Sequence, residues 1–446
     1  MRLSLPAAVR PLDGRVAVPG DKSLAHRAAL FAALAPGISE IANYPDSGVT
    51  RAMRGALASL GVTSTLEDGV LRLDGSVRRI DREGVAAPVA YCGNSGTTFR
   101  LLAGALAATG ASAVLDGSAG LRRRPMDRIA EPLRLMGADV SSVDGHAPLS
   151  FRPAKLHGID YELPIASAQV LSCLQLAALG ADSPSTFHVP GPVRDHTTRM
   201  LRAMGAEMDE NGSTIRVNPL VPSVHSRAIG CFDALRPLSG TLPGDISSAA
   251  FLFAAAAIVP GSRVMVPNVG TNVTRTGILD VLAEMGAKVS VTGPGDTFGE
   301  PVGDVTVEAA PLRGVDIRGN LVVRCIDEFP AIAAVAAFAE GTTCVRDATE
   351  LRYKESDRIA AIVSQFRALG AEVEEYPDGF SIRGGTLKGG IATAGGDHRL
   401  AMSLALCGLR AVQPVAVDGA EILDESFPGF VSALDGLRAG QSFGVV

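Results

Sequence analysis

One helix-like segment recurs six times along the chain, and this repeat constrains the fold more than any other feature. Each copy opens on a polar residue, and the openings lie about 75 positions apart, close to one sixth of the 446 residues. Copies such as DISSAAFLFAAAAI and DEFPAIAAVAAFAEG are apolar all round, which predicts buried rather than surface helices. The six copies begin near Lys22, Asn94, Ser167, Asp245, Asp327 and Asp397.

A second helix-like segment also recurs, and it ends in a short glycine signature before a strand-like stretch. The copies are LASLGV, LRLMGADV, LRAMGAEM, LAEMGAKV, FRALGAEV and, more weakly, LDGLRAG, which ends at Gly440. The glycines predicted to be helix C-caps are Gly61, Gly137, Gly205, Gly286 and Gly370. Strand-like pieces such as SRVMVPNV (262–269) and TTCVRDAT (342–349) lie between the two helix types. Each repeat is therefore predicted to be a small α/β unit.

The six repeats divide into two sets of three. The tripeptide Pro-Gly-Asp at 19–21 returns at 243–245, where the fourth repeat starts, and a chain of this length exceeds what one core usually supports. We expect two similar domains of the α/β (α+β) class, each built from three repeated βαβαββ-like units with buried helices. The first is expected over 21–243, and the second over 244–446 together with the N-terminal strand 1–19, with two crossings between them.

Composition and charge restrict the function classes. Hydrophobic residues make up 47% of the chain and charged residues 20%, which is typical of a globular protein. The formal net charge of −6 argues against nucleic acid or an anionic membrane as a general partner. No apolar stretch is long enough to cross a bilayer, and the N-terminus lacks the apolar run of a signal peptide. We therefore expect a cytoplasmic protein.

The six cysteines lie far apart and form no CxxC or Cys/His ligand pattern. They are predicted to be buried free thiols in a reducing compartment, and the sequence predicts no metal site.

Basic and polar groups gather at the predicted starts of the buried helices. A helix N-terminus carries free N–H groups and roughly half a positive charge, so it favours phosphate and carboxylate ligands. A lone Ser, Asn or Asp there is more simply an N-cap. Lys and Arg are not needed as caps, so their presence at these helix starts indicates a ligand. Only five of the 41 basic residues are Lys, which makes a Lys inside a motif informative. Together they predict an anion site formed by Lys22, Ser23, Arg27, Asn94 to Thr98, Ser167, Gln169, Asp327, Asp397 to Arg399, and Arg122 to Arg124 before a helix expected from Pro125.

Lys354 and Arg358 lie four positions apart in LRYKESDRIAAI, which on a helix would place them on one face. Two cations on one face suit an anionic ligand. The alternative is a solvated helix face on which Glu350, Glu355 and Asp357 are the ion-pair partners.

Eight segments in order resemble the 5-enolpyruvylshikimate-3-phosphate synthase family, over about Val18 to Phe430. They are PGDKSLAHRAAL (19–30), GNSGTTFRLLAG (93–104), LRRRPMDR (121–128), ASAQVLS (166–172), RDHT (194–197), DEFPAIAAVAAFAEG (327–341), LRYKESDRI (351–359) and DHRLAMS (397–403). The resemblance implies the enolpyruvyl transferase fold, an inside-out α/β barrel in each of two domains. It also implies an active site in the cleft between them, with domain closure over the substrates.

The resemblance further implies the ligands of two substrates. For shikimate 3-phosphate, the matching positions are Lys22, Ser23, Arg27, Ser167, Ala168, Gln169, Arg194, Asp327 and Lys354. For phosphoenolpyruvate, they are Lys22, Asn94, Gly96, Arg124, Gln169, Arg358 and Arg399. Arg suits these ligands because its planar fork binds phosphate and carboxylate in a bidentate manner. Arg100 is expected to be structural support rather than a ligand.

The implied reaction transfers the enolpyruvyl (carboxyvinyl) group of phosphoenolpyruvate to the 5-hydroxyl of shikimate 3-phosphate, with release of phosphate, in chorismate and aromatic amino-acid biosynthesis. It needs deprotonation of a hydroxyl and reversible protonation of a methylene carbon, which two carboxylates and a lysine can perform without metal or cofactor. The implied catalytic residues are Asp327 at the hydroxyl, Glu355 at the methylene, and Lys22 or Lys354 in proton transfer. We expect a monomer.

The sequence departs from some relatives at four positions. Glu425 stands where some carry Lys, which removes one cation from the phosphoenolpyruvate side. Glu350 replaces an Asn, and Ala168 replaces a Ser. Leu101 replaces the Pro of glyphosate-sensitive relatives, although Gly96 is kept.

Two alternatives stay open. The UDP-N-acetylglucosamine enolpyruvyl transferases share the repeated fold, but they usually rely on a Cys in the loop that is here Gly110 to Arg124, which contains none. A non-catalytic anion-binding protein on the same fold would keep the cations but would not need Asp327 and Glu355.

Overall fold

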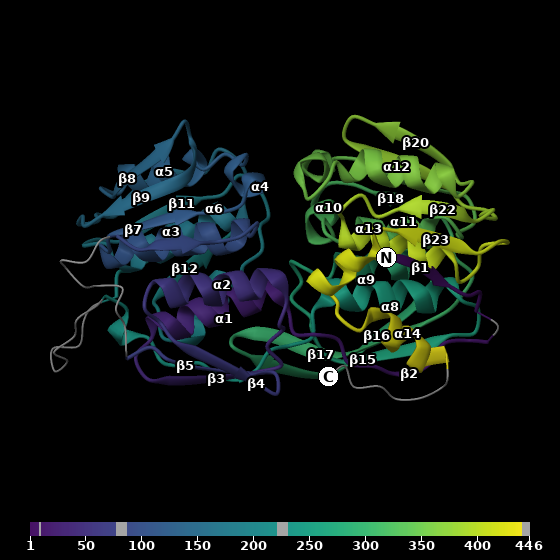
Figure 1. The fold of residues 1–446 in the computed structure, drawn as a ribbon, viewed down its shortest axis with the longest axis horizontal. Coiled ribbons are helices and arrows are strands. Elements are labelled where there is room, and N and C mark those ends of the chain that lie inside the picture. Colours follow the sequence, from purple (N-terminus) through teal and green to yellow (C-terminus); the bar gives the residue numbers. More distant parts are fainter. Residues whose placement is uncertain (9, 77–86, 221–230, 439–446) are drawn as a thin grey trace. The chain divides into compact units, whose positions relative to one another are not determined.

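The computed structural model describes residues 1–8, 10–76, 87–220 and 231–438 (Figure 1). The chain divides into two compact units of mixed α/β structure. One consists of residues 20–242 and 297–300, and the other of residues 1–19, 243–296 and 301–446. They are called here the 20–242 unit and the 243–446 unit. The sequence expectation did not include the excursion of 297–300 into the 20–242 unit.

The 20–242 unit contains three repeats, each with its own sheet and a buried helix. In the first, the sheet has the order β14-β3-β5-β4, and the elements are β14 (Ser239–Thr241), α1 (Lys22–Leu34), β3 (Ile38–Ala42), α2 (Gly48–Ser59), β4 (Ser64–Glu67) and β5 (Val70–Asp74). The second has β6 (Val89–Tyr91), α3 (Gly96–Thr109), β7 (Ala113–Asp116), α4 (Ala119–Arg122), α5 (Asp127–Leu135), β8 (Asp139–Val143) and β9 (His146–Arg152). The third has β10 (Asp160–Glu162), α6 (Ala168–Leu179), β11 (Ser185–His188), α7 (His196–Ala203), β12 (Met208–Asn211) and β13 (Thr214–Val217), followed by η1 (Cys231–Ala234).

The 243–446 unit has the same organisation and takes in the N-terminal strands. Its first repeat has β2 (Asp13–Arg15), α8 (Ile246–Ile258), β15 (Arg263–Gly270), α9 (Gly277–Glu284), β16 (Lys288–Thr297) and β17 (Glu300–Glu308). The next has β18 (Asp316–Ile317), α10 (Asn320–Arg324), α11 (Phe329–Ala336), β19 (Thr342–Val345), η2 (Thr349–Tyr353), α12 (Arg358–Ala368), β20 (Glu372–Tyr376) and β21 (Gly379–Arg383). The last has β22 (Gly390–Thr393), α13 (His398–Cys407), β23 (Val415–Asp418), η3 (Ala420–Glu425), α14 (Phe430–Arg438) and β1 (Arg2–Leu5).

Strand pairing is the same in five of the six repeats, and the last repeat has the three-stranded order β1-β23-β22 among the described residues. In each repeat two strands pair in parallel, one on each side of the buried helix, as β6 does with β7 and β18 with β19. In the first repeat one of the two, β14, comes from the end of the 20–242 unit. The next strands return antiparallel, so that β8 pairs with β9 and β20 with β21. Such a crossover through a helix is the usual way to join parallel neighbours. The expected βαβαββ-like repeat is confirmed.

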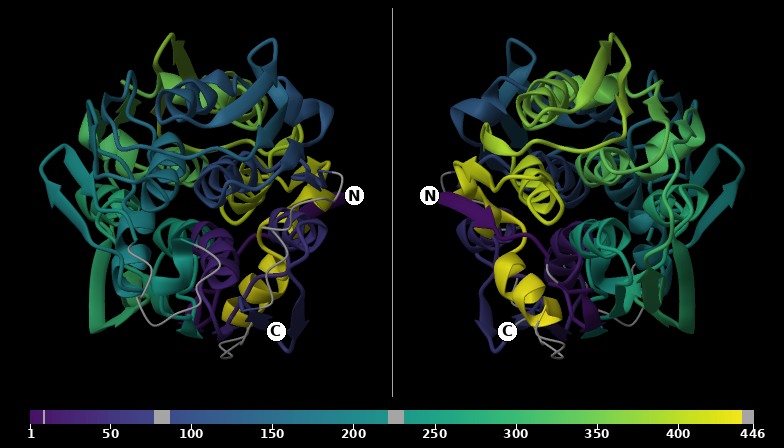
Figure 2. Two further views of the ribbon diagram at one scale, coloured as in Figure 1. Left: turned by 90° about the vertical axis from the view of Figure 1, so that its left-hand side faces the viewer. Right: turned by 90° about the vertical axis from the view of Figure 1, so that its right-hand side faces the viewer.

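The predicted all-apolar helices lie inside their units and the sheets form the outer faces (Figures 1 and 2). Every residue of α8 is buried, and so is every residue of α11. Each unit has its own apolar core, formed in the 20–242 unit around α1, α3 and α6 and in the other unit around α8, α11 and α13. Among the described residues, no helix is long and apolar enough to cross a membrane.

The buried helices begin within two residues of the predicted positions because a polar side chain caps most of them. Asp21 accepts from the N–H of Leu24 at the start of α1, and Ser95 accepts from Thr98 at the start of α3. At the start of α6 the cap is Ser167. Such caps satisfy backbone N–H groups that have no partner inside the helix. The first turns of these helices are thereby fixed in place.

The signature glycines end their helices as predicted. Each adopts a positive φ, between +87° for Gly61 and +111° for Gly286, one residue after the helix C-cap. A residue with a Cβ is strained in this left-handed region, whereas glycine is not. Gly440, at the end of the weak sixth copy, lies outside the described residues.

Three local expectations were wrong. Lys354 does not share a helix with Arg358, because Asp357 caps α12 through the N–H of Ala360 and so starts the helix at Arg358. The helix expected from Pro125 begins instead at Asp127. All six cysteines are free, but Cys231 and Cys344 are only partly buried, in the case of Cys344 because it alternates with the buried Thr343 and Val345 along β19.

Candidate functional site

The predicted site residues fall into two groups, one in each unit. The 20–242 unit holds Lys22, Ser23, Arg27, Asn94, Gly96, Arg124, Ser167, Ala168, Gln169 and Arg194. The 243–446 unit holds Asp327, Lys354, Glu355, Arg358 and Arg399.

In the 20–242 unit, Arg27 links the N-terminal parts of three helices, α1, α6 and α7. Its side chain is buried at 4% exposure and donates to the hydroxyl of Thr197 at 2.8 Å, the hydroxyl of Ser172 at 3.1 Å and the carbonyl of Ser23 at 3.0 Å. Ser172 in turn donates to the carbonyl of Ala168 at 2.6 Å. The structure therefore brings the predicted residues of α1 next to those at the start of α6 and to the segment that opens α7.

A second cluster of the same unit surrounds Gly96 at the start of α3. A Cβ at this position would lie 2.8 Å from Nη1 of Arg100 and 3.0 Å from Nη1 of Arg124, so glycine gives the two guanidinium groups room to approach. Gln169 joins the cluster because its Oε1 accepts from Arg100 and its amide nitrogen donates to Thr97 at 3.0 Å. Arg100, expected to be structural support, thus holds a predicted ligand directly.

The charge of this cluster is positive. Burial, Arg128 and Arg124 together lower the pKa of Arg100 to about 10. Like charges disfavour one another's ionised forms, and Arg100 is buried at 6% exposure. A bound anion would relieve this repulsion, so the cluster suits phosphate or carboxylate.

Asn94 and His26 lie at the edges of this cluster. Asn94 is exposed and accepts from the hydroxyl of Ser118 at 3.2 Å, so it shapes the turn, while Ser95 is the cap of α3. His26 is buried, with its Nδ1 2.6 Å from the carbonyl of Lys22 and its Nε2 3.2 Å from the hydroxyl of Ser95. Burial lowers the pKa of His26 to about 4. His26, which sequence reasoning did not single out, is therefore neutral at pH 7 and links α1 to α3.

Ser167 and Arg194 are half-buried, and the hydroxyl of Ser167 is used as the cap of α6 through the N–H of Val170 at 3.4 Å. Arg194 lies two residues before α7. Arg194 thus lies three residues before Thr197, whose hydroxyl accepts a hydrogen bond from Arg27.

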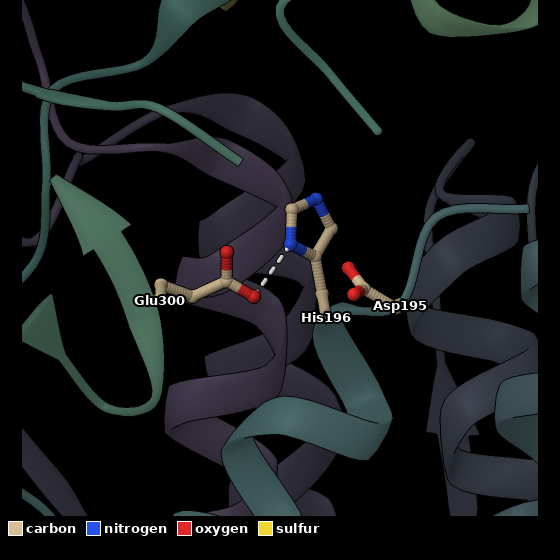
Figure 3. Close-up of side chains that lie close together, drawn as sticks. All are labelled: Asp195, His196 and Glu300. Atoms are coloured by element: carbon tan, nitrogen blue, oxygen red, sulfur yellow. Dashed lines mark hydrogen bonds and ion pairs between the residues drawn. The ribbon is translucent and has the colours of Figure 1, made fainter. Parts of the chain in front are cut away.

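Asp195, His196 and Glu300 lie close together (Figure 3). Their ligand atoms lie within 4.8 Å of one another, a spacing at which a metal ion can be held. However, Nδ1 of His196 pairs with Glu300 at 2.8 Å and Asp195 pairs with Arg199 at 2.6 Å. Both carboxylates therefore already have partners in the described part of the chain. We interpret the group as the contact that fixes the tip 297–300 on α7.

In the 243–446 unit, Arg358 is the centre of a group of carboxylates. It is buried at 1% exposure, and donates to Asp397 through Nε at 2.7 Å and to Glu355 through Nη2 at 2.7 Å. Its Nη1 lies 3.6 Å from Oδ1 of Asp327 and has no hydrogen-bond partner among the described residues. Burial opposes the charge, but the carboxylates outweigh it and raise the pKa of Arg358. The solvated-face alternative is wrong about the exposure of Arg358, although its ion-pair partner Glu355 is one that this alternative expected.

The carboxylate of Asp327 lies close to two cations, Lys354 and Arg358. The N-cap position of α11 belongs to Glu328, so the plain N-cap explanation of Asp327 is wrong. The side chain of Asp327 is 16% exposed, with Oδ1 3.8 Å from Nζ of Lys354. Lys354 also pairs with Glu350 at 2.9 Å, as the solvated-face alternative expected.

Glu355 is ionised at neutral pH. Burial of its carboxyl disfavours the charge, but Arg358 outweighs burial and, with help from His398 and Arg399, lowers the pKa of Glu355 to about 2. Its side chain remains 41% accessible. At pH 7 a carboxylate with this pKa holds no proton to donate, and it is a weaker base than an ordinary Glu.

Arg399 completes the group and reveals a residue that sequence reasoning missed. Its Nη1 donates to the backbone carbonyl of Asp327 at 2.9 Å and lies 3.7 Å from Oε1 of Glu328. Glu328 is fully buried and accepts from the hydroxyl of Ser247 on α8. One signal was available in the sequence, since a Glu at the start of a helix predicted to be buried all round would itself be buried.

The two groups differ in chemistry. The group in the 20–242 unit is rich in Arg and in hydroxyl and amide groups, which suits binding of phosphorylated anions. The group in the 243–446 unit combines carboxylates with buried cations, which suits proton transfer next to a negatively charged ligand.

Comparison with known proteins gives a consistent result. The family model of EPSP synthase (3-phosphoshikimate 1-carboxyvinyltransferase) matches residues 6–434. A 3-phosphoshikimate 1-carboxyvinyltransferase of Roseiflexus sp. (strain RS-1) is 49% identical over 430 residues, covering 95% of this chain and 96% of that protein. Its counterpart from Syntrophomonas wolfei subsp. wolfei is 42% identical over 437 residues, covering 97% and 99%.

Solved structures are similar as well. The EPSP synthase of Acinetobacter baumannii superimposes with a TM-score of 0.86 at 36% identity, covering 99% of this chain and 98% of that one. The enolpyruvyl transferase NikO of Streptomyces tendae superimposes with a TM-score of 0.74 at 20% identity, a likeness that supports the fold alone.

Proposed function

The chain belongs to the EPSP synthase (3-phosphoshikimate 1-carboxyvinyltransferase) family, and from that premise we propose which of its side chains perform the reaction. The protein is an enzyme that transfers the enolpyruvyl group of phosphoenolpyruvate to shikimate 3-phosphate in aromatic biosynthesis. What remains to be assigned is the role of each residue in this chain.

Shikimate 3-phosphate is assigned to residues of the 20–242 unit, with Asp327 and Lys354 added from the other unit. The support is the convergence of α1, α6 and α7 on Arg27, whose bonds to Thr197 and Ser172 hold these helix starts together. The binding residues in the 20–242 unit are Lys22, Ser23, Arg27, Ser167, Ala168, Gln169 and Arg194. Ala168 offers only its backbone, so the hydroxyl of Ser167 and the amide of Gln169 remain the polar side chains of that strip.

Phosphoenolpyruvate is assigned to Lys22, Asn94, Gly96, Arg124, Gln169, Arg358 and Arg399. In the 20–242 unit the support is the positive cluster around Gly96. In the other unit it is Nη1 of Arg358, which has no hydrogen-bond partner in the described part of the chain. Glu425 is exposed at the end of η3, and we assign it no role in binding.

The single observation that most supports the catalytic assignment is the position of Asp327 and Glu355 on either side of Arg358, at 3.6 Å and 2.7 Å from its guanidinium nitrogens. Asp327 takes the proton of the shikimate hydroxyl as that oxygen attacks C2 of phosphoenolpyruvate, and the methylene carbon gains a proton. Glu355 then removes a proton from the resulting methyl group while the C2–O bond to phosphate breaks.

Because the pKa of Glu355 is low, we assign the protonation of the methylene carbon in the first step to another donor. Before substrate binds, Glu355 has no proton to give, so Lys22 or Lys354 is the better source. Phosphoenolpyruvate bound to Arg358 would share the charge of that guanidinium and raise the pKa of Glu355. Glu355 would then exchange the proton more readily in the complex than in the free enzyme.

The acceptor test separates the alternatives. Purified protein is expected to release phosphate from phosphoenolpyruvate when shikimate 3-phosphate is present, measured by a phosphate-release assay. Release with UDP-N-acetylglucosamine instead would favour the other transferase. Absence of release with either acceptor would favour a non-catalytic anion-binding protein.

We also propose that the enzyme acts as a monomer in the cytoplasm. A single mass matching the 45.9 kDa chain in light scattering supports the first part, and a dimer mass contradicts it. Fractionation of the source cells tests the second.

A further inference from the structure

Glu328 is a buried carboxylate that the reaction assigned above does not use. It is 0% exposed, and its Oε2 has no hydrogen-bond partner among the residues that the structure describes. Burying a charged carboxylate costs several kcal/mol unless it is paired, so such a group requires an explanation. Helix capping does not provide one, because the side chain makes no cap hydrogen bond to the described part of α11.

The other oxygen of Glu328 faces Arg399. Oε1 lies 3.7 Å from Nη1 of Arg399, and the same Nη1 donates to the backbone carbonyl of Asp327 at 2.9 Å. The side chain of Arg399 is only 7% exposed, so water screens this attraction little. The charge of Glu328 therefore favours the guanidinium position next to Asp327.

A polar network beneath Glu328 fixes its carboxylate. The hydroxyl of Ser247 donates to Oε1. Ser247 accepts from Nη2 of Arg275 at 2.9 Å, and the same Nη2 lies 3.4 Å from Asp245. All of these side chains are buried, so the carboxylate cannot turn toward water to escape Arg399.

We propose that Glu328 is a positioning residue that holds Arg399 in the orientation in which it binds phosphoenolpyruvate. Glu328 does not touch the substrate; it acts through the guanidinium that does. This inference rests on the proposed role of Arg399, and the experiments below separate the two.

The first experiment compares Glu328→Gln with Glu340→Gln. Both changes remove one carboxylate charge from the same segment, but Glu340 is exposed beyond the end of α11. Glu328→Gln is expected to raise the KM for phosphoenolpyruvate about tenfold. This is the usual change in affinity when one hydrogen bond or ion pair to a charged group is lost. The kcat and the affinity for shikimate 3-phosphate are expected to change little. Glu328→Asp, which keeps the charge, is expected to recover part of the KM.

Glu340→Gln is expected to match the parent enzyme. If Glu328 has only a structural role, Glu328→Gln would instead lower kcat, both affinities and the unfolding temperature together, and that outcome would overturn the proposal. An unchanged KM for phosphoenolpyruvate would overturn it as well. If Glu328→Gln does not fold, Ser247→Ala decides, because loss of the orienting hydroxyl is expected to raise the same KM, and an unchanged KM there overturns the proposal.

A double-mutant cycle tests whether the effect passes through Arg399. Arg399→Ala alone is expected to raise the KM for phosphoenolpyruvate; if it does not, the proposed role of Arg399 fails. In the Arg399→Ala background, Glu328→Gln is expected to add no further increase. A full additional increase there overturns the positioning role of Glu328 and leaves the role of Arg399 intact.

Discussion

At the scale of single residues, the site residues of the 243–446 unit differ from ordinary surface residues because several of their charges are buried. Arg358 and Asp397 are 1% and 0% exposed and bonded to each other at 2.7 Å. Removing one partner of such a pair leaves an uncompensated buried charge, which is strongly destabilising. Asp327 differs, since its side chain is partly accessible and its Oδ1 lies 3.6 Å from Arg358 and 3.8 Å from Lys354. A neutral side chain at this position is therefore expected to leave the fold intact.

The test of Asp327 is Asp327→Asn. Turnover is expected to fall by about 10² to 10⁴, the usual contribution of one general acid or base, because the amide cannot take up the hydroxyl proton. The affinity for both substrates is expected to fall less. Steady-state kinetics and calorimetry measure the two effects. Unchanged turnover would remove Asp327 from the mechanism.

His26 gives a pH prediction. Its folded pKa is about 4, below the ordinary value of 6.5, so the unfolded chain takes up this proton at a higher pH than the folded protein does. The free energy of unfolding is therefore highest above pH 6.5 and falls as the pH is lowered toward 4. This decrease is on the order of 3 kcal/mol, because each unit of pKa difference contributes about 1.36 kcal/mol.

Urea unfolding at several pH values from 4 to 7 measures this effect. His26→Gln is expected to flatten the dependence of the unfolding free energy on pH in that window. Parallel curves for the variant and the parent would show that His26 is not the titrating group.

At the scale of elements, close packing of the buried helices depends on glycine at one contact. On α3, a Cβ at Gly104 would lie 2.1 Å from the backbone oxygen of Cys173 on α6. The small residue therefore sets how near the two helices approach. Gly55 on α2 is the opposite case, because no described atom lies within 4 Å of its added Cβ.

The pair Gly104→Ala and Gly55→Ala tests this packing. Gly104→Ala is expected to lower the unfolding free energy by about 1–3 kcal/mol or more, because it forces α3 and α6 apart. Gly55→Ala is expected to raise it by about 0.5–1 kcal/mol through helix propensity alone. Denaturant unfolding measures both. Equal effects of the two substitutions would contradict the close approach at Gly104.

At the scale of the whole molecule, the chain forms two units with separate apolar cores. Residues 297–300, at the tip of the β16–β17 hairpin, belong to the 20–242 unit. Thr297 donates to the carbonyl of Thr241 at 2.9 Å, and Glu300 pairs with His196.

We predict that the units close on binding shikimate 3-phosphate, because the proposed reaction uses residues of both. Small-angle scattering is expected to show a smaller radius of gyration with shikimate 3-phosphate than without it. Unphosphorylated shikimate serves as the control, and it is expected to have less effect because it lacks the group assigned to Arg27 and Arg194. Identical profiles with and without the phosphorylated ligand would contradict closure.

The sequence by itself determined the repeat, the buried helices, the glycines that end their neighbours, and the family. These features depend on local patterns, since apolar periodicity sets burial and a positive φ selects glycine at positions such as Gly61 and Gly286. Only the tertiary structure decided which charges meet. That Glu328 faces Arg399 and that the tip 297–300 pairs with α7 both depend on segments distant in sequence. The energy of a charge is set by its burial and its partners, and neither can be obtained from a local pattern.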